Sequence, residues 1–454
     1  MICRKKYDSL NRDHRVKLID SNFGTKIGFQ SFCMRIAIIG AGATGLTAAW
    51  ELKKRGYHDV VVFEKDDRVG GKTHSVIYKG EAFDLGSMTF STADQTARLA
   101  EQFGIPYQQV EAKSIYLEGD RAVHPFAYAR KQYSTIEIFS AYLRFRSLVR
   151  AYRIGETGYG MSVPDLFVPF QKFAQDHGIE ALAYAAEPAV TGYGYGFYSE
   201  VPAVFHLKLL ASMLASDFIS TLFFRKSMMC FFPDGWSRVW ERMAQQLVVR
   251  VDSPITKMVF HSGKWSLSIQ NGSVEQFDRV IVTSSLPSLG KMMSLDAEME
   301  SLFSEIRSYR MVSTLIEGSR ALPSGFLVRN TNKDRFGHVQ GIECYKPQTR
   351  CSVLFQVVPW NTPKAEIERI IREDLCDFDC RIKNIVLQKE WEYFYHVSPK
   401  GLQNGFYQKM YQRQGERGLF FANSVFNFES VQRCQEFAQE IVQTFFPDVN
   451  HVSE

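Results

Sequence analysis

The stretch RIAIIGAGATGLTAAWELKKRGYHDVVVFE, residues 35–64, decides the fold of this chain. Arg35 to Ile39 is a short β-branched run of the kind found in buried parallel strands. The segment LTAAWELKKRG has helical spacing and ends at Gly56. Val60 to Phe63 is a second β-branched run, and Glu64 follows at its carboxyl end. We therefore predict the βαβ unit that binds a dinucleotide.

The glycines between the first strand and the helix explain how such a unit would hold a pyrophosphate. Gly40 permits a tight turn, Gly42 lets backbone N–H groups come close, and Gly45 lets the helix pack against the strand. The helix N-terminus adds partial positive charge. Glu64 stands about 20 residues further on, where a carboxylate accepts hydrogen bonds from ribose hydroxyls. A glycine motif alone is weak evidence, but the strand, helix and acid in register are specific.

Length and composition predict an ordinary globular protein of several domains. The 454 residues suggest roughly two to three domains at about 150 residues each. Apolar residues make up 45% of the chain and charged residues 23%, which excludes disorder as the dominant state. The net charge of +5 is too small to require nucleic acid, so we predict no nucleic-acid partner.

The eight cysteines contain no CxxC pair. Cys376 and Cys380 are four residues apart and would share one face of a helix, but no second pair or nearby histidine completes a metal site. We therefore predict no metal, free thiols, and a reducing, cytoplasmic location.

Two segments bear on targeting. Residues 206–224 form the best candidate for a membrane span, but Lys208 and Asp217 interrupt it, so we predict a helix that lines an apolar space and no transmembrane segment. Transient contact with a membrane stays open. Residues 1–33 are polar and have no apolar core, so they predict a leader or an over-extended start before Met34 and not a secretory signal. A genuine N-terminal extension is an equal alternative.

The segment after Glu64 distinguishes flavin from nicotinamide. Asp67-Arg68-Val69-Gly70-Gly71-Lys72 resembles the flavin-containing amine oxidase superfamily, whose members carry an RxGG stretch just after the ribose-binding acid. Phe83-Asp84-Leu85-Gly86-Ser87 resembles the next block of that superfamily. The resemblance implies FAD as the cofactor. It also implies an α/β fold: a Rossmann-like, glutathione-reductase-like FAD-binding domain of the amine oxidase type, with an inserted α+β substrate domain and a helical insertion.

The same resemblance implies roles for individual residues. Arg68 would reach toward the phosphates, and Val251 falls where the family places backbone against adenine. The residues expected to bind the cofactor are Gly40, Gly42, Ala43, Gly45, Glu64, Lys65, Arg68, Gly70, Gly71, Lys72, Gly86, Ser87, Val251, Ser424 and Val431.

One position departs from the family pattern. The family ends its flavin site with Ala-Gly-Asp or Ala-Gly-Glu, whose acid meets the ribityl chain, whereas this chain has Ala422-Asn423-Ser424. A serine hydroxyl bonds a ribityl hydroxyl less strongly than a carboxylate does. We therefore expect weaker cofactor binding at this position.

The pattern of segments predicts how the domains are divided. Residues 34–112, 228–299 and 391–454 form the expected FAD-binding domain. Residues 113–227 lose the strand and helix alternation and predict a mainly helical substrate or lid insertion, and residues 300–390 predict an α+β substrate domain. Expected strands are Val248 to Phe260, Trp265 to Ile269, Asp278 to Thr283 and Ser352 to Val358, with a helix from Pro363 to Asp377.

Within the superfamily, several blocks resemble the polyenoic fatty acid isomerase branch. These are Gly194-Tyr195-Gly196, Val201-Pro202-Ala203, Phe336-Gly337-His338-Val339 and the stretch from Trp391 to Ser398. The branch implies a double-bond isomerase: a hydride leaves the methylene between two double bonds for flavin N5 and returns at another carbon. The expected substrate is an unsaturated fatty acid.

Candidate substrate residues follow from the aromatic and apolar segments and from the resemblance. Tyr193, Tyr195, Phe197 and Tyr198, with the helix around Leu210, could form the wall of an acyl tunnel. Lys113 lies near where the isomerase has an arginine for the substrate carboxylate. The expected substrate-binding residues are Lys113, Tyr193, Tyr195, Lys208, Leu209 and Met213, and the weak catalytic candidates are Tyr193, His338 and His396.

Two other functions stay open. An amine oxidase would pass electrons to oxygen and release peroxide, although Lys257, Lys291 and Lys346 lie outside any motif for the lysine that such enzymes place near flavin N5. A non-catalytic flavin- or lipid-binding relative would fit the change at Asn423 and Ser424. The intact glycines and Glu64 favour an enzyme.

Overall fold

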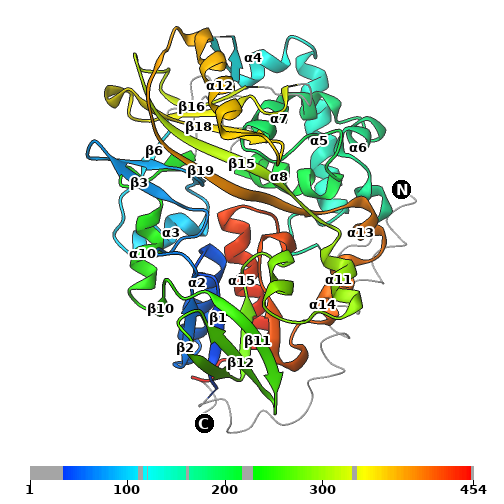
Figure 1. The fold of residues 1–454 in the computed structure, drawn as a ribbon. Helices are drawn as coiled ribbons and strands as arrows, with labels where there is room; N and C mark the ends of the chain where they lie inside the picture. The colour runs from blue at the N-terminus through cyan, green and yellow to red at the C-terminus, as the bar shows by residue number, and fades with distance from the viewer. Residues whose placement is uncertain are drawn as a thin grey trace.

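A computed structural model describes residues 34–110, 116–119, 121–159, 163–216, 229–329 and 335–450. The described chain forms two layered regions joined by long strands (Figure 1). The predicted leader, 1–33, lies outside the described residues. Among the helices that the structure describes, none is long and apolar enough to cross a membrane.

The lower region in Figure 1 is built on a five-stranded parallel sheet in the order β10-β2-β1-β14-β20. Every residue of β1 and β2 is buried, because helices cover the faces of a parallel sheet. Helices α2 and α15 pack against each other, and α10 also contacts α2. The elements are β1 (Ile36–Ile39), β2 (Val60–Phe63), β10 (Val248–Arg250), β14 (Arg279–Val282), β20 (Leu419–Phe421), α2 (Ala43–Lys54), α10 (Ser237–Ala244) and α15 (Val431–Phe445).

Smaller antiparallel elements surround this sheet. The single strand expected from Val248 to Phe260 is wrong: it is two strands, β10 and β11, in different sheets. The chain turns between them at Asp252, which has a positive φ of 47°. The surrounding elements are β3 (Ser75–Tyr78), β4 (Glu81–Asp84), β5 (Phe90–Ser91), α3 (Gln95–Gln102), β6 (Gln108–Gln109), β9 (Met229–Phe231), β11 (Ile255–His261), β12 (Lys264–Ile269), β13 (Val274–Phe277), α11 (Ala297–Phe303), α13 (Pro399–Gln403) and α14 (Phe406–Gln412).

The upper region contains a seven-stranded sheet in the order β19-β15-β18-β17-β16-β7-β8. Its long strands β15 and β19 pair along most of their length and run down toward the lower region (Figure 1). The expected domain boundary between residues 390 and 391 therefore falls inside β19. The elements are β7 (Tyr116–Glu118), β8 (Arg121–Val123), β15 (Ile306–Gly318), β16 (Gly325–Arg329), β17 (Val339–Cys344), β18 (Cys351–Val358), α12 (Lys364–Asp374) and β19 (Ile382–Val397).

A group of helices covers one side of this upper sheet. Helix α7 is central: it contacts β16 and β17 on one side and α4, α5 and α6 on the other. Its outer neighbour α5 begins with a capping box in which Ser134 and Glu137 exchange hydrogen bonds. The helices are α4 (Pro125–Ala129), α5 (Thr135–Ala151), α6 (Phe170–Asp176), α7 (Glu180–Gly192) and α8 (Ala203–Ser216). The predicted α/β fold class, with helical and α+β insertions, is confirmed.

Candidate functional site

One cavity of about 950 Å³ runs from the glycine turn after β1 into the upper region. This volume lies at the upper end of the range of about 300–1,000 Å³ for small-molecule and cofactor sites. Its walls come from the β1–α2 turn, the loop after Glu64, helices α7 and α8, the segment after β14, strand β19 and the start of α15. The five-stranded sheet, the helical group and the seven-stranded sheet thus all contribute to one site.

The lower end of the cavity is made of closely packed backbone. Gly42, Ala43 and Thr44 begin α2 and line the cavity, and no side chain caps this helix. Its first N–H groups therefore carry the partial positive charge that attracts an anion. A Cβ on Gly71 would lie 3.1 Å from Gly42 Cα, and a Cβ on Gly45 would lie 1.9 Å from Gly40 O. Side chains at these positions would push the turn apart.

Glu64 is buried at the end of β2 and lines the same end of the cavity. Its Oε2 accepts a hydrogen bond from Ala41 N at 2.8 Å, and its Oε1 accepts one from Asp66 N at 3.0 Å. Each carboxylate oxygen retains lone-pair capacity for a further donor. The side chain therefore braces the turn and still offers an acceptor to a ligand.

Three of the expected cofactor residues do not line the cavity. The Arg68 guanidinium donates to Val69 O at 3.1 Å and Gly71 O at 2.7 Å, so it braces the glycine loop and does not line the cavity. Val251 is 38% exposed and also lies outside the lining, because the turn at Asp252 carries it away. Ser253 and Ile255 line the cavity beyond that turn. Gly45 packs behind the lining, and the remaining expected cofactor residues line the cavity.

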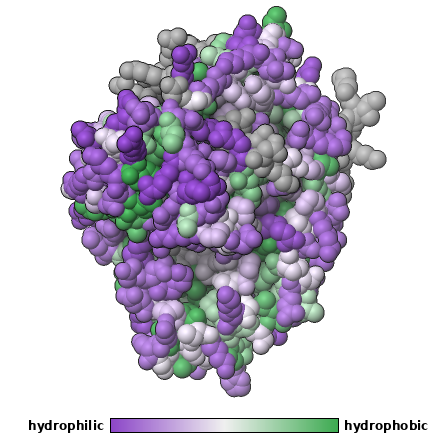
Figure 2. Space-filling model, turned by 45° about the horizontal axis from the view of Figure 1, so that its top comes forward, coloured by the Kyte–Doolittle hydropathy of each residue, from purple (hydrophilic) through white to green (hydrophobic). Residues whose placement is uncertain are grey.

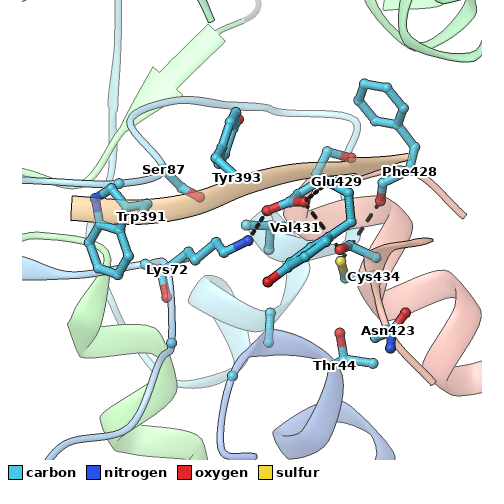
Figure 3. A pocket seen from close by; sticks show the side chains of 18 of the residues that line it. Thr44, Lys72, Ser87, Trp391, Tyr393, Asn423, Phe428, Glu429, Val431 and Cys434 are labelled. Atoms are coloured by element: carbon cyan, nitrogen blue, oxygen red, sulfur yellow. Dashed lines mark hydrogen bonds and ion pairs between the residues drawn. The ribbon is translucent and has the colours of Figure 1, made fainter. Parts of the chain in front are cut away.

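The middle of the cavity holds a partly buried ion pair that the sequence did not indicate. Lys72 Nζ bonds Glu429 Oε1, and the two side chains point toward each other in Figure 3. Glu429 Oε2 also accepts from Tyr395 N at 2.7 Å and from Ser424 Oγ at 3.3 Å. The Lys72 ammonium lies 4.7 Å from the centre of the Tyr395 ring. The carboxylate of Glu429 is thus fully partnered at the centre of the site.

At the position where the family pattern has an acid, Ser424 is therefore accompanied by the carboxylate of Glu429. Its hydroxyl lies within hydrogen-bond reach of Glu429, five residues along the chain. Asn423 accepts a hydrogen bond from Val425 N at 3.2 Å and donates to Ser284 O at 3.1 Å, so its side chain fixes the turn after β20. The only sequence signal for Glu429 was an acid directly before Ser430, the N-cap of α15.

The upper end of the cavity is mostly apolar. Tyr193, Tyr195, Leu209 and Met213 line it, as the sequence led us to expect, with Leu210 beside them. Further lining residues are Ala185, Ala186, Ala189, Ile306, Met311 and Phe326. Phe197 and Tyr198 do not line it; the Tyr198 ring packs against His206 instead.

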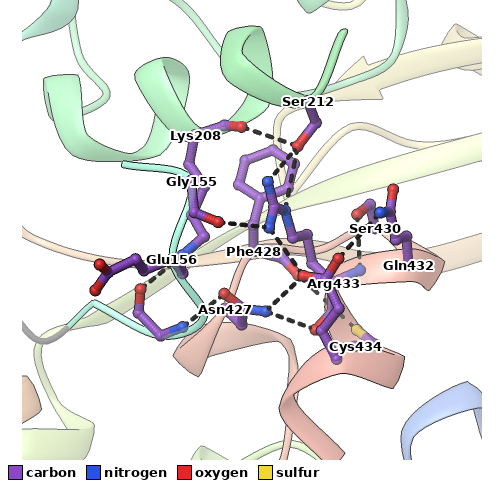
Figure 4. A network of polar contacts seen from close by, with 12 residues as sticks. Gly155, Glu156, Lys208, Ser212, Asn427, Phe428, Ser430, Gln432, Arg433 and Cys434 are labelled. Atoms are coloured by element: carbon purple, nitrogen blue, oxygen red, sulfur yellow. Dashed lines mark hydrogen bonds and ion pairs between the residues drawn. The ribbon is translucent and has the colours of Figure 1, made fainter. Parts of the chain in front are cut away.

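Lys208, expected to bind a substrate, does not line the cavity. Lys208 is buried with its ammonium directed at two backbone carbonyls, Glu156 O at 2.8 Å and Gly158 O at 2.6 Å (Figure 4). A buried ammonium needs such acceptors, which is the physical reason for the difference. Lys113 lies outside the described residues.

The two histidine candidates also lie away from the cavity. His338 Nδ1 bonds Asp374 Oδ1 at 2.8 Å in the upper region. His396 Nδ1 donates to Phe394 O at 2.9 Å, and burial lowers the pKa of His396 to about 4. Tyr193 is the one catalytic candidate that lines the cavity. Among the described lining residues there is no histidine.

Cys434 lines the cavity, and burial raises the pKa of its thiol to about 12, so the thiol is neutral at ordinary pH. Within the described ranges no three His, Cys, Asp or Glu side chains form a group that could hold a metal ion. Besides the Lys72–Glu429 pair, the charged side chains Lys291, Lys389, Glu390 and Glu392 line the cavity.

Comparisons with known proteins agree with this arrangement. A family model described as flavin containing amine oxidoreductase matches residues 43–427. The polyenoic fatty acid isomerase of Ptilota filicina is 23% identical over 513 aligned positions, which cover 96% of this chain and 100% of that one. Protoporphyrinogen oxidase 2 of Arabidopsis thaliana is 30% identical over 163 residues, 35% of this chain and 32% of that protein.

Solved structures show the same fold. The crystal structure of a CLA-producing fatty acid isomerase from P. acnes superposes with a TM-score of 0.82 at 24% identity, covering 92% of this chain and 99% of that one. A putrescine oxidase bound to putrescine gives a TM-score of 0.64 at 16% identity, with 90% and 97% coverage.

Proposed function

This chain belongs to the flavin containing amine oxidoreductase family, and on that premise we propose that it is an FAD-dependent isomerase that moves a double bond in an unsaturated fatty acid. The family makes the chain an FAD-dependent enzyme. The substrate and the reaction are the proposal. Its support is a cavity that joins a glycine-built anion site to an apolar chamber without a histidine among its described lining residues.

The lower half of the cavity fits FAD. The uncapped start of α2 would hold the pyrophosphate, with the backbone of Gly70 and Gly71 beside it. Glu64 would accept hydrogen bonds from the adenosine ribose, and Ser424 with Glu429 would face hydroxyls of the ribityl chain. These roles agree with the close approach of the Gly42 and Gly71 backbones, where a Cβ on Gly71 would lie 3.1 Å from Gly42 Cα.

The upper chamber suits an apolar chain. Leu209, Leu210 and Met213 on α8 face the cavity with alanines of α7, so a hydrocarbon replaces water there at no polar cost. Bound FAD supplies the redox step, because a flavin can accept a hydride from carbon and give it back. Removing and returning the same hydride moves the double bond with no net oxidation and no external electron acceptor.

The residues of the chain then hold the substrate and exclude water. The Lys72 ammonium and Glu429 carboxylate neutralise each other, so the centre of the site carries no net charge that would favour water over hydrocarbon. Tyr195 OH donates to Glu429 O at 3.0 Å and fixes one wall of the chamber beside α15.

At the Lys72–Glu429 pair, the geometry disfavours an amine as substrate. An alkylammonium needs an accessible acid or an uncharged aromatic cage. Glu429 is already bonded to Lys72, and the Lys72 ammonium occupies the faces of both Tyr393 and Tyr395. A second positive charge at this point would be repelled.

The proposal is tested by anaerobic absorption spectroscopy of the FAD-loaded protein with linoleate, which has two double bonds separated by one methylene. We expect a near-ultraviolet conjugated-diene band that grows while the flavin bands stay unbleached. Lasting bleaching would instead indicate net oxidation, and peroxide formed with putrescine in air would indicate an amine oxidase.

Oleate is the matched control substrate, because its single double bond cannot give a conjugated diene. A diene band with oleate would mean that a contaminant or net desaturation produces the signal. No spectral change with any polyunsaturated acid, in protein that retains FAD, would overturn the isomerase proposal and leave the family assignment intact.

A further inference from the structure

Helix α5 exposes an apolar stripe on the outside of the helical group. Ile136 is 81% exposed, Phe139 49% and Leu143 48%. With 3.6 residues per turn, these three positions fall within about 60° of one another on the helix surface. They therefore form one strip, and we call Ile136, Phe139 and Leu143 the α5 stripe.

Single exposed apolar residues are common and need no explanation. The face in Figure 2 is mostly hydrophilic, with hydrophobic residues in small patches. Other strongly exposed apolar residues, such as Ile77 and Trp360, lie on different elements. What distinguishes α5 is that its three exposed apolar side chains share one face of one helix.

Helix α5 packs on the protein through its inner face, which is distinct from the α5 stripe. Ile138, Ala141, Tyr142 and Phe145 are buried, and the helix packs on α7 through them. The helix is therefore apolar on two opposite sides, although a surface helix of a globular protein normally has one apolar face.

The charges around the stripe are predominantly positive. Arg144, Arg146 and Arg150 are exposed on α5 and Arg130 precedes it, whereas the helix carries one acid, Glu137; Lys131, also before the helix, is paired with Glu118. Arg146 and Arg150 project on the same outer side as the stripe, since they follow Phe139 and Leu143 by seven positions each. An apolar strip with basic residues beside it matches an interface of apolar chains and anionic headgroups.

We propose that the α5 stripe and its neighbouring arginines form a docking surface for an anionic lipid membrane. The helix would lie in the plane of the membrane surface with Ile136, Phe139 and Leu143 among the acyl chains. Helix α7, directly beneath α5, lines the upper chamber with Ala185, Ala186 and Ala189. Docking thus brings a membrane to within one helix layer of the chamber. Its use for substrate entry rests on the proposed function, but docking itself does not.

The test is cosedimentation of the FAD-loaded protein with vesicles of phosphatidylglycerol and phosphatidylcholine, compared with vesicles of phosphatidylcholine alone. We expect binding to the anionic vesicles that weakens as salt rises. The variant Ile136→Ser/Phe139→Ser/Leu143→Ser should lose about tenfold or more in partitioning, and Arg146→Gln/Arg150→Gln should lose roughly tenfold on anionic vesicles only.

The matched control is Ile77→Ser/Trp360→Ser, which removes exposed apolar residues elsewhere and should bind like the parent protein. Equal losses in the control and stripe variants, or no binding of the parent to anionic vesicles, would overturn the proposal. So would a dimer in light scattering that the stripe substitutions dissociate, because the stripe would then be an interface with a second copy. Vesicle binding is measured without turnover, so failure of the isomerase proposal would not affect this result.

Discussion

Glu64 connects the end of β2 to the cavity. Its carboxylate already accepts two backbone N–H groups, and it lines the cavity at the end of β2. We expect Glu64→Gln to weaken FAD binding by about ten- to a hundredfold, because hydrogen bonds to a charged group are worth about 1.5–3 kcal/mol. FAD retained after gel filtration, measured from the ratio of flavin to protein absorbance, checks this.

Asp67→Asn is the matched control for that substitution, since Asp67 is exposed three residues away and does not line the cavity. It should retain FAD like the parent protein. Equal retention in both variants would show that Glu64 braces the turn without contacting the cofactor.

The Lys72–Glu429 pair allows a second prediction at this scale. Glu429 is buried while Lys72 is about one-third exposed, so solvent screens the pair in part. We expect Lys72→Met to lower the free energy of unfolding by about 1–3 kcal/mol, because a buried carboxylate loses its counter-charge. Urea unfolding of Lys72→Met, Glu429→Gln and the double variant would give the coupling energy. Additive single effects would contradict a stabilising pair.

Some of these residues could be predicted from the sequence and others could not. Gly40, Gly42 and Glu64 lie around the cavity because their spacing within one βαβ unit nearly fixes their geometry, and Lys72 follows eight residues after Glu64. Glu429 escaped prediction because its partner Lys72 lies 357 positions away in sequence. Lys208 looked like a binding residue in an apolar helix, but its acceptors are backbone carbonyls about 50 positions earlier.

At the scale of elements, β4 and β17 each carry a buried carboxyl group, Asp84 and Glu343. Burial raises the pKa of Asp84 to about 7, although Ser75 and Trp236 N donate hydrogen bonds to it. Burial and the nearby Asp84 also raise the pKa of Glu343 on β17. The Lys346 ammonium counteracts both shifts, and it donates to Ala82 O and Pro233 O, which lie on β4 and on the loop before α10.

This arrangement predicts a pH dependence of stability. In the unfolded chain Asp84 ionises above about pH 4, whereas the folded chain holds the proton until about pH 7. The folded state therefore binds more protons in this window, and its stability falls as pH rises from about 4 to 7. Asp84→Asn should reduce that slope by up to about 1.4 kcal/mol per pH unit. Chemical unfolding at several pH values tests it; parallel curves for parent and variant would refute it.

A second connection between elements is made by Arg433 on α15, seen in Figure 4. Its guanidinium donates to Ser212 Oγ on α8 at 2.8 Å, to Gly155 O at 3.3 Å and to Glu436 at 2.8 Å. Ser212 lines the cavity, so this network fixes α8 against α15 at the edge of the cavity. We expect Arg433→Gln to cost about 2–3 kcal/mol of stability because buried acceptors lose a charged donor.

The control is Arg369→Gln on α12, an exposed arginine paired with Glu366 and Glu373. Exposed pairs of this kind contribute about 0.3–0.5 kcal/mol each. A comparable loss in both variants, measured by urea unfolding, would mean that the Arg433 network adds nothing beyond a surface ion pair.

Sequence patterns predicted some elements well and others poorly for a physical reason. Strands β1 and β2 are short, fully buried and uniformly apolar, so local composition identifies them. Strand β19 is sixteen residues long, mixes charged, aliphatic and aromatic residues, and pairs with β15, about 80 residues earlier. Its length and its course across the expected domain boundary depend on that distant partner, which no local pattern contains.

At the scale of the whole molecule, the site is shared by every part of the fold. The five-stranded sheet supplies the glycine turn, the helical group supplies α7 and α8, and the seven-stranded sheet supplies β19. A ligand that touches all three must therefore stabilise all three together. Binding of FAD becomes a measure of how the regions are coupled.

Removing FAD should therefore lower the melting temperature of the entire chain in one transition. Ligand at a hundred times its dissociation constant adds about 2.7 kcal/mol, which predicts a rise of several degrees in scanning fluorimetry. FMN should raise the melting temperature less, because it has no adenosine ribose for Glu64 to bind. If the protein instead melts in two transitions and FAD shifts only one of them, the upper region folds independently. The cavity would then be an interface between two units and not part of a common core.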